Sequence, residues 1–259
     1  MKIICARFAS KSGAKVGALS RDKIDLARVI HDNEPVLRWG FTPTPAWVRF
    51  INDAEPISLA ANKSMSRTVL DKAGVAVPKI IDLYKDNEVR LPIIGRPEKH
   101  HGAVGFHKIE TLHQLVYAYN RGCRYFAELI DKQEEYRVHV VSNRILFVQN
   151  KNIAFGQEVG NMDNVKWSVI KRSEWDKDLC KIGLDAVRAL GLLFGAVDVL
   201  KSTEGKYMAL EVNTAPGLCN YSAWKYLQWI DWLKDNVDDC YFHDRNPERA
   251  SGYAFLVKP

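Results

Sequence analysis

The chain has 259 residues, which can bury a sizeable core either as one large domain or as two to three small lobes. Hydrophobic residues make up 47% and charged residues 26%, a composition that argues against a disordered chain and against a membrane-embedded protein. The formal net charge of +6 suits an anionic ligand such as a nucleotide. Because the basic residues are spread along the chain rather than blocked, this charge does not favour a nucleic-acid groove.

The first residues contain too short an apolar run for a signal peptide, and no apolar stretch approaches the length of a membrane span. We therefore expect an intracellular, cytoplasmic protein that makes no membrane contact. The five cysteines are odd in number and scattered, without a C-x-x-C pair, so we expect reduced thiols and no zinc site.

The first third of the chain predicts an α/β opening. Residues 2–6 and 35–39 are typical of short strands, and the apolar spacing of residues 22–33 predicts a helix between them. Residues 40–47 are rich in turn formers and predict a loop. The segment that begins at residue 57 predicts one helix ended by Gly74 in the left-handed conformation, followed by Pro78 and a strand.

The middle of the chain predicts strands. Residues 88–110 read as strand, turn and strand, and Gly102 and Gly105 bracket a flexible tip that makes this hairpin a lid candidate. Three further apolar runs follow between residues 123 and 151, and Ser142-Asn143 predicts a tight hairpin between the last two.

The last third predicts an amphipathic helix over residues 175–193, two strands, and a final helix over residues 222–236. The final helix carries an apolar stripe that predicts core or interface packing; its members are Trp224, Leu227, Ile230, Trp232 and Leu233.

The two strands of the last third carry polar side chains among apolar ones. If they turn at residues 203–205, Asp198 lies directly opposite Glu211, and with a longer loop the two are diagonal neighbours on the same face. Asn213 shares this face because side chains two apart on a strand point the same way. Oxygen ligands of this kind suit Mg²⁺ that also binds phosphate. The alternative is a pair of charges at a sheet edge, but the apolar surroundings favour a metal site.

About residues 60–220 resemble the ATP-grasp superfamily, in particular its carboxylate-amine ligases, including a branch common in bacteriophage genomes. Five segments match in order: NKSMSRTVLDKAGVAVP, PIIGRPEKHHGAVGF, FAELI, EEYRVHVV, and GAVDVL with LEVNTAPGL. The resemblance implies an α/β ATP-grasp fold in which two lobes enclose ATP. It divides the chain into an N-terminal βαβ domain (1–60), a small lobe with a glycine-rich lid (61–125) and a C-terminal lobe with the metal site (126–259).

The resemblance also implies roles for individual residues. Glu128, Leu129 and Ile130 would meet adenine, Glu135 would hold the ribose hydroxyls, and Arg137 would face the reacting phosphate or carboxylate. An alternative for Arg137 is an ion pair with a neighbouring glutamate, Glu134 or Glu135.

The triphosphate would lie against basic and glycine residues, and the metal against the polar strand residues. For the phosphates the candidates are Lys63, Arg96, Gly102, Gly105 and Lys151, where Arg96 replaces the usual lysine and Lys99 is its alternative. The metal ligands would be Asp198, Glu211 and Asn213.

The implied activity is an ATP-dependent ligase that forms an amide or peptide bond through an acyl phosphate and releases ADP and phosphate. Its cofactors would be ATP and two Mg²⁺ ions, with Mn²⁺ as a substitute. Its partners would be a small-molecule or peptide carboxylate, an amine acceptor, and a second copy in a homodimer. A phage-encoded enzyme would act in the host cytoplasm. The alternatives are an ATP-grasp small-molecule kinase and a non-catalytic nucleotide-binding module.

Overall fold

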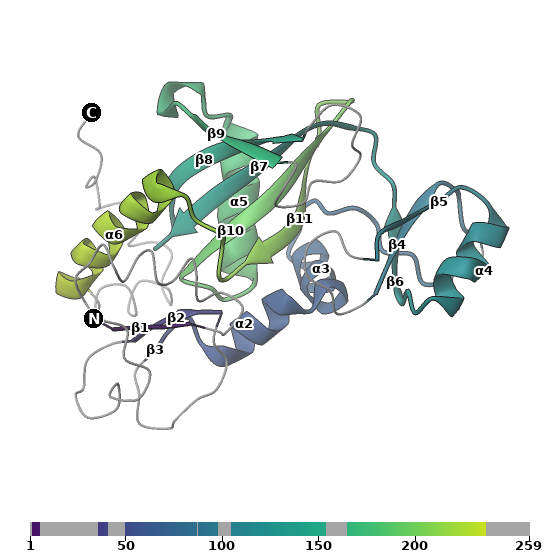
Figure 1. Cartoon of the computed structure of the whole chain (residues 1–259), viewed down its shortest axis with the longest axis horizontal. Coiled ribbons are helices and arrows are strands. Elements are labelled where there is room, and N and C mark those ends of the chain that lie inside the picture. Colours follow the sequence, from purple (N-terminus) through teal and green to yellow (C-terminus); the bar gives the residue numbers. More distant parts are fainter. Residues whose placement is uncertain are drawn as a thin grey trace.

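The computed structural model describes residues 2–5, 36–40, 50–86, 88–97, 105–153 and 165–236. The predicted helix over residues 22–33, nearly all of the predicted loop that follows it, and Gly102 therefore lie outside the described residues. Three sheets organise the described part, and Figure 1 shows them in a row, with the largest in the middle.

The N-terminal sheet has the parallel order β1 (Lys2–Cys5), β2 (Val36–Trp39) and β3 (Phe50–Ile51), which confirms the two predicted strands. Two helices follow, α2 (Ala54–Ala61) and α3 (Lys63–Lys72), where the sequence predicted one. The prediction was wrong because Asn62 is extended, with φ −94° and ψ 105°, and its side chain caps α3 by accepting a hydrogen bond from the Met65 N–H. Gly74 has the predicted left-handed φ of 76°.

The small sheet has the order β5 (His107–Ile109), β4 (Ile93–Arg96) and β6 (Tyr125–Glu128), and α4 (Leu112–Asn120) packs beside it. The antiparallel pairing of β4 with β5 confirms the two predicted strands, and residues 98–104 of the predicted turn between them lie outside the described residues. The strand predicted after Pro78 was wrong, because only a single bridge from Ile80 to Ala127 forms there.

The central sheet is antiparallel, in the order β11, β10, β7, β8, β9. Its strands are β7 (Lys132–Val141), β8 (Arg144–Ile153), β9 (Val165–Ile170), β10 (Phe194–Ser202) and β11 (Tyr207–Asn213). The predicted tight hairpin between β7 and β8 is confirmed, since Ser142 and Asn143 have φ of 46° and 59°.

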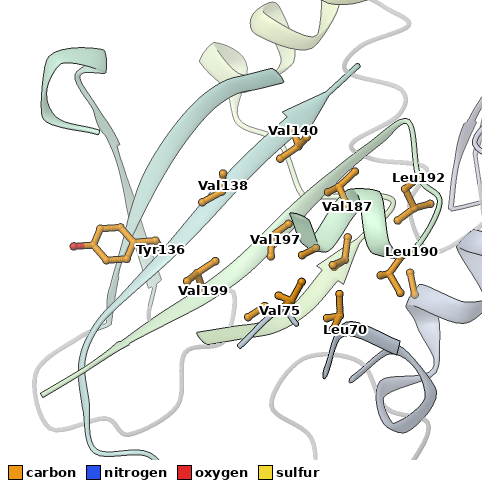
Figure 2. Packing of buried hydrophobic residues seen from close by; sticks show 14 of the residues in the cluster. Leu70, Val75, Tyr136, Val138, Val140, Val187, Leu190, Leu192, Val197 and Val199 are labelled. Atoms are coloured by element: carbon orange, nitrogen blue, oxygen red, sulfur yellow. The ribbon is translucent and has the colours of Figure 1, made fainter. Parts of the chain in front are cut away.

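One face of the central sheet packs on α5 (Lys177–Ala189), which follows a 3₁₀ turn at Arg172–Glu174. Figure 2 shows this core, in which Val138, Val197 and Val199 of the sheet meet Val187 of α5. Gly183 of α5 permits the close approach, because a Cβ there would lie 2.5 Å from Cγ1 of Val138.

Part of the opposite face packs on α6 (Asn220–Asp235) and on the N-terminal sheet through a second apolar cluster. Ile230 and Leu233 of α6 are buried as predicted, but Trp224 is 47% exposed, and Tyr226 and Trp229 take the core positions instead. Among the helices of the described residues, none combines the length and the apolar character that crossing a bilayer requires. The remainder of this second face carries the polar side chains of the candidate site.

Candidate functional site

The two strand carboxylates lie directly opposite each other. The β10–β11 register pairs Asp198 with Glu211, which confirms the predicted direct pairing, although a bulge between Asp198 and Val199 shifts the register by one residue toward the turn. The neighbours Val197 and Val199 point to the opposite face, into the core with α5. Only 6% of Asp198 is exposed, so its charge requires a partner within the protein or in a ligand.

Arg137 of β7 is the partner of Asp198. The β10–β7 register sets the two residues opposite each other, and the guanidinium binds the carboxylate with two hydrogen bonds, Nε to Oδ1 at 2.5 Å and Nη2 to Oδ2 at 2.9 Å. The guanidinium carbon also lies 4.4 Å from the centre of the Trp167 ring. The alternative pairing of Arg137 with Glu134 or Glu135 is therefore not the arrangement observed.

Glu211 has a cation and an amide for partners. Lys63, the first residue of α3, forms an ion pair with Glu211 Oε2, and Asn213 Nδ2 donates to Oε1 at 3.2 Å. Burial alone would raise the pKa of Glu211, but Lys63, Arg137 and Asn213 together lower it to about 2. Glu211 is therefore ionised at neutral pH.

A second ion-pair cluster lies beside the first on β7. Lys151 and Lys132 contact the two oxygens of Glu135, each at 2.7 Å. Burial raises the pKa of this carboxyl, but the two lysines lower it by more than burial raises it, so the pKa lies below its ordinary value. The residue predicted for the ribose and one predicted for phosphate are thus in direct contact.

Two arginines form a basic corner next to Glu211. Arg96 ends β4 and its guanidinium lies 5.1 Å from the centre of the Phe106 ring. Burial and the charge of Arg67 lower the pKa of Arg96, and Glu211 opposes them. Arg67 of α3 donates from Nε and Nη2 to the Leu210 carbonyl, each at 3.2 Å, and within the described part of the chain its buried Nη1 has no acceptor.

Arg67 was not among the residues predicted from sequence. It lies four residues after Lys63, and on a helix this spacing puts both side chains on one face. That face meets β11, because Lys63 contacts Glu211 and Arg67 contacts Leu210. The helical spacing of two basic residues could therefore have identified Arg67.

The segment predicted for adenine connects the small sheet to the central sheet. Glu128 ends β6, and Leu129 and Ile130 lie half-buried before β7 begins. The Glu128 N–H donates to the Lys79 carbonyl at 3.0 Å, whereas the main-chain groups of the next two residues bond to none of the described residues. Those groups are therefore available to a ligand.

One glycine of the predicted lid is described. Gly105 has φ of 71°, and a Cβ at this position would lie 2.7 Å from the ring of Pro97. Both observations exclude an ordinary side chain there. The structure thus joins Lys63, Arg137, Asp198, Glu211 and Asn213 in one cluster, while Glu135 with Lys151, Arg96, and residues 128–130 form separate groups.

Comparison with known proteins extends these observations. No protein-family model matches the chain. A D-alanine--D-alanine ligase from Dechloromonas aromatica (strain RCB) is 27% identical over 184 residues, which cover 64% of this chain and 61% of that protein. One from Pseudomonas putida (strain GB-1) is 23% identical over 187 residues, covering 64% and 58%. The chain thus spans about three fifths of the length of the curated relatives that it matches.

Solved structures are similar over more of the chain. A D-alanine--D-Alanine ligase from Bacillus anthracis superposes with a TM-score of 0.66 at 16% identity, over 97% of this chain and 98% of that one. The ATP-grasp ligase PsnB, complexed with minimal precursor, gives a TM-score of 0.59 at 12% identity, over 86% and 97%. The chain therefore has an ATP-grasp fold, which confirms the fold class predicted from its sequence.

Proposed function

We propose that the chain is an ATP-dependent carboxylate-amine ligase that binds D-alanine or another small carboxylate, or a peptide, together with an amine acceptor. The observation that carries the proposal is the cluster in which Asp198 and Glu211 face each other between cations, on the face of the central sheet opposite α5 in an ATP-grasp fold. The D-alanine--D-alanine ligases among its relatives support the reaction class.

The donor set fits magnesium. Two carboxylates and an amide oxygen are hard ligands, and the pKa of Glu211 near 2 keeps that carboxylate ionised at neutral pH. Asp198, Glu211 and Asn213 would hold the ions, two in number, with Mn²⁺ as a substitute. Bound there, Mg²⁺ would neutralise phosphate charge and act as a Lewis acid on the phosphoryl oxygens.

The proposed reaction has two steps. A carboxylate oxygen of the substrate attacks the γ-phosphorus of ATP, the bond to the β–γ bridging oxygen breaks, and ADP leaves. The amine nitrogen then attacks the carbonyl carbon of the acyl phosphate, giving a tetrahedral oxyanion. Phosphate leaves with the bonding electrons, the nitrogen loses a proton, and an amide remains.

The residues of the chain would bind, orient and neutralise. Arg137 and Arg96 would offset negative charge on the phosphoryl group in flight, since preformed donors cost little reorganisation. Lys63 and Lys151 would contact phosphate oxygens, and Glu135 would accept from the ribose. The main-chain groups at Leu129 and Ile130 would meet adenine.

The glycine-containing hairpin between β4 and β5 would cover the triphosphate and exclude water from the acyl phosphate. The same proposal includes the division into residues 1–60, 61–125 and 126–259, a homodimer, a bacteriophage origin and action in the host cytoplasm. These finer statements rest on the resemblance alone.

The test is ADP release measured over pairs of carboxylates and amines, with D-alanine among both. Hydroxylamine should trap the acyl phosphate as a hydroxamate, whereas a kinase that forms a stable product gives none. Asp198→Asn should lower ADP release at least about 100-fold, the scale of losing one transition-state contact. Asp185→Asn, the same change on the exposed surface of α5, should leave it unchanged. If acids stimulate ADP release but none of them yields a hydroxamate, the ligase proposal is refuted.

A further inference from the structure

A buried polar row crosses the central sheet next to Arg137. Gln149 of β8 lies directly opposite Arg137, and His139 lies two residues further along β7, so all three side chains share the face that carries Asp198. His139 is fully buried, and its ring stacks on Phe147 with centroids 4.0 Å apart.

The hydrogen bonds of this row fix one proton arrangement. Nε2 of His139 lies 3.0 Å from Oε1 of Gln149, and Nδ1 lies 3.0 Å from the Tyr226 hydroxyl. A carboxamide oxygen only accepts hydrogen bonds, so Nε2 carries the proton. Burial, and then the charge of Arg137, hold the pKa of His139 well below its ordinary value, so the ring is neutral. Nδ1 is therefore an acceptor, and the Tyr226 hydroxyl donates to it.

This arrangement orients the Gln149 amide. Because its oxygen is bound to His139, its nitrogen is the group left for other contacts. Gln149 is only 5% exposed, and its nitrogen has no hydrogen-bond partner among the described residues. This nitrogen nevertheless keeps some solvent-accessible surface. The amide N–H groups therefore reach solvent on the face that carries Arg137.

Arg137 also has N–H groups for which the described part of the chain provides no acceptor. Asp198 takes one N–H from Nε and one from Nη2, out of the five that a guanidinium carries. The Trp167 ring lies over the guanidinium, so a ligand approaches the remaining N–H groups along the guanidinium edge. Arg137 and Gln149 occupy directly opposite positions on β7 and β8, and no carboxylate side chain separates them in this strand pair. Their neighbouring N–H groups can therefore donate to the oxygens of one oxyanion.

We propose that Gln149 is a binding residue for the oxyanion that Arg137 receives, and that His139 and Tyr226 are positioning residues that turn its amide N–H groups toward that anion. The ligand class is an oxyanion, either the substrate carboxylate or the phosphoryl group that it accepts. This inference rests on the proposed function for the identity of the anion, and on the contacts above for the existence of the site.

The test measures the affinity of the full-length protein for two probe anions, acetate and inorganic phosphate, by calorimetry with ADP and Mg²⁺ present, which leave the position of the transferred phosphoryl group open. Gln149→Met has a similar length but no donor, and we expect it to weaken binding of at least one anion roughly 5- to 10-fold. Gln149→Glu still accepts from His139, so it keeps the buried bond, and its charge should weaken binding further. The affinity for ADP, which lacks the transferred phosphoryl group, should stay within about twofold in both variants.

Tyr226→Phe tests the positioning role. Without the hydroxyl, Nδ1 of His139 loses its donor, the ring can exchange tautomers and the Gln149 amide can turn its oxygen outward. We expect roughly threefold weaker anion binding, with the affinity for ADP unchanged. Gln228→Met, on the exposed side of α6, is the matched control and should change neither affinity.

The two anions separate the sources. Weaker acetate binding in the Gln149 variants assigns the site to a carboxylate, and weaker phosphate binding alone assigns it to the phosphoryl group. Anion affinities within twofold of the wild type in both Gln149 variants, or a wild type that binds neither anion, would overturn the inference. Failure of the ligase proposal is a separate result, because it is measured as ADP release and hydroxamate formation and not as anion affinity.

Discussion

Replacing Glu211 by glutamine should remove a distinct part of the pH dependence of stability. The pKa of this carboxyl is about 2 in the folded protein and ordinarily 4.5. At about 1.4 kcal/mol per pKa unit, that difference corresponds to at most roughly 3 kcal/mol of unfolding free energy. Since 32% of the side chain is exposed and solvent screens its ion pair with Lys63, we expect about 1–2 kcal/mol.

The sign follows from the lowered pKa. In the folded state the carboxyl resists protonation, so its contribution is fully present above pH 4.5 and is lost as the pH falls from 4.5 toward about 2. Urea unfolding at about pH 7 and about pH 3.5 measures the loss as a change in unfolding free energy. Because the contribution is only partly lost at about pH 3.5, the wild type should lose about 1 kcal/mol more than Glu211→Gln between these two conditions.

Glu204→Gln is the matched control, because Glu204 pairs with Lys206 on the exposed β10–β11 turn. Its unfolding free energy should follow that of the wild type closely at both pH values. Lys63→Met should reduce the pH dependence as Glu211→Gln does, since Lys63 is the cation in contact with that carboxylate. Parallel curves for the wild type and Glu211→Gln would show that this ion pair does not hold the charge, and would refute the reasoning.

Two further substitutions test how the N-terminal part and α5 hold the central sheet. Asn52 has a φ of 62°, and its side chain forms hydrogen bonds with the main chain at Leu193 and Phe194. Asn52→Ala should therefore lower the unfolding free energy by about 2–4 kcal/mol, and Asn52→Gly should lower it by about 1 kcal/mol less because glycine adopts that φ easily. Equal stability of Asn52→Ala and the wild type in urea unfolding would contradict this. Gly183→Ala should lower the unfolding free energy by about 1–3 kcal/mol despite the better helix propensity of alanine, because its Cβ would clash with Val138. In urea unfolding, Val138→Ala should then cost less stability in the Gly183→Ala background than in the wild type. Additive losses of unfolding free energy would argue against the clash.

Local sequence signals predicted the parts of the fold that depend on neighbouring residues. The short turn after β10 predicts an antiparallel pair that brings Asp198 and Glu211 together, but their direct pairing also depends on a bulge between Asp198 and Val199 that shifts the register by one residue. Gly74 adopts the predicted positive φ for a similar local reason. The sequence predicted one helix from residue 57 where the structure has two, because apolar spacing does not reveal that Asn62 caps a second helix.

The contacts that define the candidate site join residues far apart in the sequence. Lys63 meets Glu211 across 148 residues, and His139 meets Tyr226 across 87. Neither strand alternation nor helical spacing contains this information, so Gln149 was missed, and the pairing of Arg137 with Asp198 was not among the alternatives considered. Arg67 was missed although its helical spacing from Lys63 could have identified it. The exposed Trp224 shows the same limit, since which side of α6 is buried depends on the sheet that it covers.

The central claim is that Asp198, Glu211 and Asn213 hold divalent metal against the phosphates of a nucleotide. The most direct measurement is anomalous diffraction from a crystal grown with AMP-PNP and Mn²⁺. We predict manganese peaks about 2.1 Å from oxygens of the two carboxylates, with phosphate oxygens completing the coordination. Nucleotide bound without such peaks, with Asp198 still on Arg137 and Glu211 still on Lys63, would contradict the claim.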